Sequence, residues 1–103
     1  MKLSLIKYQF KVGTKEAWHQ QVAEFIAALD NDPNLKGKVS YRCLKERNGP
    51  GYYHLAAAVD DAAVAALQKK EFFKRYQAET KRTGGGEVQV VGLELVAETK
   101  FRA

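Results

Sequence analysis

The order of strand-like and helix-like segments constrains the fold of this chain more than any other feature of its sequence. Residues 3–12 alternate apolar and polar side chains, whereas residues 15–30 place apolar side chains three and four positions apart. Residues 39–44 and 52–59 alternate again, on either side of a turn at 48–51. A period of two predicts a strand and a period near 3.6 predicts a helix. The first half therefore reads β-α-β-β.

The second half adds a helical stretch from Asp61 to Arg82 and a last strand over residues 87–99. The helical stretch has two apolar faces, one at its beginning and one towards its end. These faces point in nearly opposite directions, so a straight helix would leave one of them in solvent. We therefore expect a break near residues 68–71, with two shorter helices meeting there. The first face consists of Ala63, Val64 and Leu67, and the second of Phe72, Phe73 and Tyr76.

The complete order, β-α-β-β-α-β in 103 residues, is typical of one ferredoxin-like α+β sandwich spanning residues 1–103. Such a domain has a four-stranded antiparallel sheet with its helices on one face. The last strand is apolar on both faces, which predicts that something covers the opposite face of the sheet. A second copy is the simplest cover, so we expect a homodimer.

Composition excludes several classes of protein. The single cysteine, Cys43, rules out an internal disulfide framework and a thiolate-rich zinc site, and the presence of only two histidines argues against a multi-histidine metal site within one chain. No run of about 18 apolar residues is present, so we expect no membrane-spanning segment. The cysteine content and the absence of a signal-like start favour a cytoplasmic protein.

Aromatic side chains supply the candidate binding residues. Some lie on the strands and others on the predicted helices, so together they are able to wall an apolar pocket for a flat aromatic ligand. The alternative interpretation is that these rings are ordinary core. The candidates are Tyr8, Phe10, Tyr41 and Tyr53 on the strands, and Trp18, Phe72, Phe73 and Tyr76 on the helices.

His54 is the candidate general base, because an unperturbed imidazole titrates near neutral pH. We take Tyr53 as its tyrosine partner in proton handling. Alternation places Tyr53 on the helix side of the sheet and His54 on the side that faces a partner subunit. The alternative interpretation is a buried histidine with a purely structural role.

The segment from Val59 to Phe73 resembles the dimeric α+β barrel superfamily, in particular antibiotic-biosynthesis-monooxygenase-like domains; stress-responsive A/B barrel domains are close cousins. It keeps an acidic helix start at Asp60 and Asp61 and an aromatic pair, Phe72 and Phe73, after the expected break. The resemblance implies a barrel of two ferredoxin-like units. It also implies cofactor-free oxidation of a small aromatic or quinol-type compound by molecular oxygen.

Many members of that family end the third strand with Glu-x-Trp and carry His-x-x-Ser/Thr in the following helix. Here Ala57 and Val59 stand at the first pair of positions, and Gln68 and Glu71 at the second. These differences favour a second interpretation, a non-catalytic barrel that binds a small ligand or acts in a stress response.

A third interpretation starts from the net charge of +5. Residues 36–47 and 69–82 are rich in lysine and arginine, and basic surfaces attract nucleic acids. The RNA-recognition motif shares the same element order and stacks bases on sheet aromatics. Its signature sequence is absent around Tyr52 and His54, so RNA binding ranks last.

Overall fold

A computed structural model describes residues 1–100 of the chain. Its element order confirms the predicted β-α-β-β-α-β pattern, with the second helical stretch divided in two. The elements are β1 (Lys2–Gln9), α1 (Lys15–Asn31), β2 (Val39–Lys45), β3 (Gly51–Ala58), α2 (Asp61–Gln68), α3 (Glu71–Thr83) and β4 (Gln89–Leu93).

The four strands form one sheet in the order β2-β3-β1-β4, and every neighbouring pair is antiparallel. This is the predicted ferredoxin-like sheet. Cα partners across it include Tyr8 with Tyr52, and His54 with both Ile6 and Cys43. The register therefore aligns the aromatic residues of three strands on one face.

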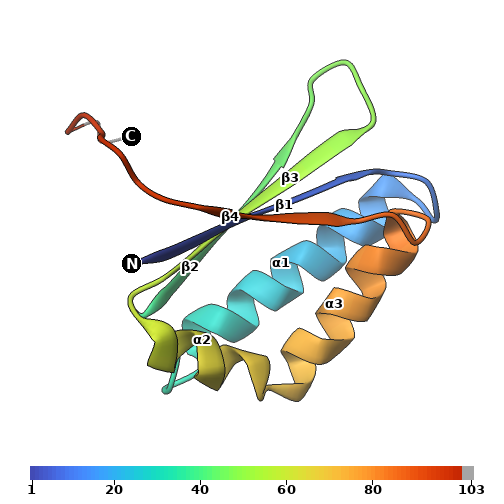
Figure 1. The fold of residues 1–103 in the computed structure, drawn as a ribbon. Coiled ribbons are helices and arrows are strands. Elements are labelled where there is room, and N and C mark those ends of the chain that lie inside the picture. The colour runs from blue at the N-terminus through green and yellow to red at the C-terminus, as the bar shows by residue number, and fades with distance from the viewer. Residues whose placement is uncertain (101–103) are drawn as a thin grey trace.

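Helices α1 and α3 lie side by side against one face of the sheet, and α2 packs beyond the end of β3 (Figure 1). Thr14 caps α1 by accepting a hydrogen bond from the Ala17 N–H at 3.2 Å. The buried stripe of α1 consists of Trp18, Val22, Phe25 and Leu29. Trp18, at its start, reaches the middle of the aromatic face of the sheet.

The predicted break in the second helical stretch is confirmed between Gln68 and Glu71. Ala63 and Leu67 are buried on α2, and Tyr76 is buried on α3, so the break lets both apolar faces reach the core. At the break, the Lys70 ammonium lies 2.9 Å from the Asp32 carboxylate beyond the end of α1. Hydrogen bonding to Lys70 lowers the pKa of Asp32. The ion pair links the break to the first helix.

The last strand departs from the prediction in length and in burial. It runs only from Gln89 to Leu93, whereas the sequence predicted residues 87–99. All its residues are exposed in the single chain, and residues 94–100 continue away from the body (Figure 1). Both faces of β4 are therefore largely open to solvent in the single chain. Within residues 1–100, no helix has the length and apolar character needed to cross a bilayer.

Candidate functional site

His54 faces the helices, which corrects the expectation that it faces a partner subunit. Its position on β3 lies opposite Cys43 of β2 and Ile6 of β1, so it shares a face with Tyr41 and Tyr8. The imidazole is completely buried, beneath Trp18 of α1 and Tyr76 of α3.

A continuous set of hydrogen bonds passes through both nitrogens of His54. On one side, Trp18 Nε1–H donates to the Tyr8 hydroxyl at 2.8 Å, and that hydroxyl lies 2.6 Å from His54 Nε2. On the other side, His54 Nδ1 lies 2.5 Å from the Tyr41 hydroxyl and 3.2 Å from the Tyr76 hydroxyl. The two hydroxyls are themselves 3.2 Å apart. We call these five residues the His54 network.

Ring packing holds the His54 network in place. The Tyr76 ring stacks on Phe25 with centroids 3.8 Å apart and on Trp18 at 5.6 Å. Tyr8 stacks on Tyr52 at 5.5 Å. Aromatic pairs of this kind contribute about 0.5–1.5 kcal/mol each beyond burial. The hydroxyls are therefore fixed by rings that belong to the hydrophobic core.

Burial keeps the His54 network uncharged. Desolvation lowers the pKa of His54 from its ordinary 6.5 to about 4, so the imidazole is neutral at physiological pH. Desolvation also raises the pKa of Tyr8, Tyr41 and Tyr76 well above the ordinary tyrosine value. Cys43, opposite His54, has its thiol pKa raised to about 11 by burial, which argues against a nucleophilic role. The hydrogen bonds of the His54 network therefore join uncharged groups.

A pocket of about 360 Å³ opens between α3 and the β1–β4 side of the sheet. Tyr41 and Tyr76 line it. The pocket therefore reaches the two hydroxyl-bearing residues beside Nδ1 of His54. Its apolar lining comes from Ile6, Phe73, Val88 and Val90. The volume lies within the range of small-molecule sites. The helix aromatics thus leave space beneath α3.

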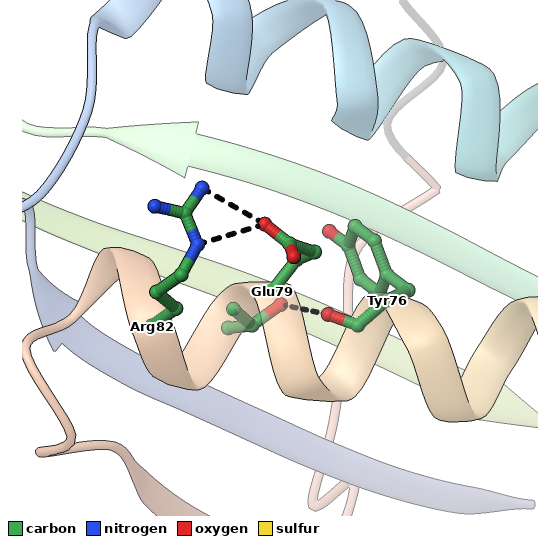
Figure 2. Close-up of polar contacts among 4 residues, drawn as sticks. Tyr76, Glu79 and Arg82 are labelled. Carbon is green, nitrogen blue, oxygen red and sulfur yellow. Dashed lines mark hydrogen bonds and ion pairs between the residues drawn. The ribbon is translucent and has the colours of Figure 1, made fainter.

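Local contacts along α3 fix the turn that carries Tyr76 (Figure 2). Arg82 donates two hydrogen bonds to Glu79 Oε2, at 3.1 and 2.9 Å. The Thr80 hydroxyl donates to the Tyr76 carbonyl at 2.9 Å, so its hydrogen is already used although Thr80 lines the pocket.

The structure brings together only some of the predicted site residues. Tyr41, Phe73 and Tyr76 line the pocket, and Tyr8 and Trp18 belong to the His54 network. Phe10 packs against Tyr52, and Phe72 packs against Phe25 beside a groove between α1 and α3.

Tyr53 lies on the opposite face from the helices, contrary to the sequence-based expectation. Its Cα partners are Lys7 and Leu44, and its hydroxyl donates to Glu46 Oε2 at 3.1 Å. The reason is the strict alternation of β3, because His54 and Tyr53 are neighbours and only one of them can face inward. The tyrosines that accompany His54 are Tyr8, Tyr41 and Tyr76.

Alternation placed Tyr52 on the same face of its strand as His54, but Tyr52 was not among the predicted site residues. This fully buried ring lies against Tyr8, and its hydroxyl is 2.7 Å from Nε2 of the exposed His19. The signal that was available is hairpin register, since counting back from the turn at 48–51 pairs Cys43 with His54. Within the described chain, no cluster of three histidine, cysteine or carboxylate side chains is arranged to hold a metal ion.

Comparison with known proteins shows a similar fold among solved structures but assigns the sequence to no family. No family model matches the sequence, and no curated protein matches it. A solved antibiotic biosynthesis monooxygenase is 16% identical, with 94% of this chain and 100% of that chain covered and a TM-score of 0.73. SnoaB, a cofactor-independent oxygenase from Streptomyces nogalater, is 14% identical over 97% and 98% of the two chains, with a TM-score of 0.74.

A dimeric ferredoxin-like protein of unknown function from Jannaschia sp. CCS1 is 23% identical over 92% and 100% of the two chains, with a TM-score of 0.63. These likenesses confirm the predicted fold resemblance to monooxygenase-like ferredoxin-fold proteins. Identities this low carry the fold alone, and function has to be argued from the site.

Proposed function

We propose that this chain is a cofactor-independent monooxygenase-like enzyme that oxidises a small aromatic or quinol-type compound with molecular oxygen. For an anthrone-type methylene the reaction is R₂CH₂ + O₂ → R₂C=O + H₂O. One oxygen atom enters the product and the other leaves as water, and the substrate supplies all four electrons. The reaction therefore requires no external reductant.

The observation that carries the proposal is the pair of phenolic hydroxyls, Tyr41 and Tyr76, at the wall of an apolar pocket and backed by a buried histidine. A substrate of this class becomes reactive towards oxygen when its own oxygen takes on negative charge. Preorganised hydrogen bonds in a dry site stabilise such a charge more strongly than water does. The hydroxyl pair is placed to bind that oxygen.

His54 acts in this proposal as a positioning residue. Its pKa of about 4 makes it a weak base, and it does not line the pocket. The hydroxyls of Tyr41 and Tyr76 lie between its ring and the ligand space. In our proposal the substrate's proton passes to water at the pocket mouth, and His54 orients the hydroxyls that stabilise the anion.

Oxygen consumption tests the proposal. The wild-type protein should consume oxygen when an anthrone or hydroquinone-type compound is added. The double variant Tyr41→Phe/Tyr76→Phe should be slower by at least about tenfold, because the hydroxyl pair that donates to the developing anion is removed. Tyr53→Phe is the matched control, since Tyr53 lies on the other face of the sheet, and it should keep the wild-type rate. Equal rates in a folded double variant would contradict the proposed role.

A non-catalytic ligand-binding protein is the second candidate. It is favoured by the uncharged state of the His54 network, because no ionised group within it assists proton removal. Tight binding of a small aromatic compound without oxygen consumption would support this alternative.

We also propose that the chain forms a homodimer through the face of the sheet that lacks helices. Support comes from Leu44, Val91 and Leu93, which are exposed apolar residues on that face of the single chain. The likeness to a dimeric ferredoxin-like protein points the same way. Ordinary monomers rarely expose a large contiguous apolar surface.

A further inference from the structure

The directions of the hydrogen bonds in the His54 network follow from which groups are able to accept. The Trp18 indole N–H only donates, and its acceptor is the Tyr8 oxygen. A neutral imidazole carries one hydrogen, so one of its nitrogens donates and the other accepts. Each tyrosine hydroxyl brings one further hydrogen that requires an acceptor.

In one tautomer the His54 hydrogen is on Nδ1. The Tyr8 hydroxyl then donates to Nε2 at 2.6 Å, and Nδ1–H donates to the Tyr41 oxygen. Tyr41 and Tyr76 share one further bond, in which one hydroxyl donates to the other. The remaining hydroxyl hydrogen of this pair has no acceptor in the network, and both side chains line the pocket.

In the other tautomer the hydrogen is on Nε2. Tyr41 and Tyr76 then direct their hydrogens towards Nδ1 and towards each other, and the pocket loses its donor. The Tyr8 oxygen now receives hydrogens from both Trp18 and His54 Nε2, and its own hydrogen has no acceptor in the network. Tyr8 is only 6% exposed, so this tautomer leaves a buried donor without a partner, which is costly. The structure therefore favours hydrogen on Nδ1.

We infer that the pocket beneath α3 selects ligands that present a hydrogen-bond acceptor without a competing donor, namely a compact apolar ring bearing a carbonyl oxygen. This inference rests on the substrate pocket of the proposed function and narrows its substrates from the quinol type, whose hydroxyls also donate, to carbonyl compounds of the anthrone type. The donor is the free hydrogen of the Tyr41–Tyr76 pair, and its direction is set from the far side of His54 by Tyr8. A ligand that only donates leaves this hydrogen without an acceptor, although an oxygen of the pair is able to accept from it.

The rest of the pocket is consistent with that ligand. Its apolar lining includes the half-buried Phe73 and Val88 and the exposed Val90, which are placed to contact a ring. The polar groups of Gln77 and Lys81 also line it, but both residues are exposed and remain hydrated. Donor–acceptor selection is therefore assigned to the buried hydroxyl pair.

Three bicyclic probes of nearly equal size test the inference. 1-Indanone offers a carbonyl acceptor, indane offers neither donor nor acceptor, and indole offers a donor N–H only. Dissociation constants would be measured by NMR titration of the wild-type protein, following resonances of the pocket residues. 1-Indanone should bind at least about tenfold more tightly than indane or indole, because only it accepts the free hydrogen.

Variants separate the hydroxyl pair from general packing. Tyr41→Phe and Tyr76→Phe should each keep much of the preference, since the remaining hydroxyl accepts from Nδ1–H and directs its own hydrogen to the pocket. The double variant should abolish the preference. Tyr53→Phe, on the other face, should leave it unchanged.

Tyr8→Phe provides the decisive control, because Tyr8 does not line this pocket. It removes the group that holds hydrogen on Nδ1, so the preference of 1-indanone over indole should fall by several fold. A purely structural role of Tyr8 would weaken all three probes equally.

Equal binding of 1-indanone and indane to the wild-type protein, or binding of neither, would overturn the inference. Oxidation of a hydroquinone without the 1-indanone preference would refute the acceptor selection and leave the proposed function standing. A preference for 1-indanone without oxidation of any substrate would support the acceptor selection and contradict the proposed function.

Discussion

The two faces of the sheet use the same four strands and differ in how completely the chain covers them. On the inner face, Tyr52 and His54 are fully buried beneath the helices, and every described buried polar side-chain atom has a hydrogen-bond partner. On the outer face, Leu44 is 51% exposed and Val91 is 41% exposed. One chain therefore encloses the His54 network alone but covers only one side of its sheet.

The largest difference between the two faces should appear in the free energy of unfolding. Replacing Trp18 by alanine removes an indole that is 2% exposed, packs on Tyr76 and donates to Tyr8. We expect a loss of about 3–5 kcal/mol, from lost burial and the cavity left behind. Urea denaturation monitored by circular dichroism measures it.

Leu44→Ala is the matched truncation on the outer face. Because Leu44 is half exposed in the single chain, its removal should cost less than about 1 kcal/mol of monomer stability, measured at a protein concentration low enough to keep the chain monomeric. Similar losses in the two variants would show that the inner face is not the main source of stability.

Acid should destabilise the inner face through His54. The pKa of His54 is about 4 in the folded chain and near its ordinary value of 6.5 in the unfolded chain. Between pH 4 and 6.5, His54 therefore binds a proton in the unfolded chain and not in the folded chain. Stability is therefore highest above pH 6.5 and falls as the pH decreases towards 4. The expected loss is on the order of 3 kcal/mol, from about 1.4 kcal/mol per pKa unit.

The control is the same pH series with His54→Gln, which should lose this component of the slope, and with His19→Gln, which should keep it. His19 is exposed and lies outside the His54 network. The carboxyl groups titrate alike in all three proteins and cancel in the comparison. Parallel curves for the wild type and His54→Gln would contradict the neutral, buried histidine.

The sequence predicted the elements and the break in the second helical stretch because both follow from local periodicity. The two opposed apolar faces, with Leu67 on one and Tyr76 on the other, are satisfied only when the helix is interrupted. The Lys70–Asp32 ion pair at the break was not predictable, since it joins residues far apart in the sequence.

Periodicity could not decide which face of β3 points inward. Both alternating sets contain a tyrosine, and the set with Tyr53 and Leu55 is the more apolar, so hydrophobicity favoured the wrong face. Hairpin register decides the matter. It places His54 on the same face as Tyr41 and Cys43, which belong to the more buried side of β2. The length of the last strand was overpredicted for a related reason: apolar side chains after Leu93 have no neighbouring strand of the same chain described beside them.

The smallest effect on folding, and the sharpest test of the outer face, comes from neighbouring residues of β4. Val91 lies on the outer face, across from Leu5, whereas Val90 lies on the inner face, across from Ile6. Both are exposed, at 41% and 67%, so a lysine at either position should change the free energy of monomer unfolding by no more than about 0.5 kcal/mol.

The two variants should nevertheless differ in mass in solution. Wild-type protein and Val90→Lys should sediment as dimers, and Val91→Lys should sediment as a monomer, because only Val91→Lys places a charge between the two sheets. The melting temperature of the dimers should also rise with protein concentration, as association stabilises the folded chain, whereas that of Val91→Lys should not. A dimeric Val91→Lys, or a monomeric wild type, would show that the outer face is not where two copies meet. The exposed leucines and valines of that face would then need another partner.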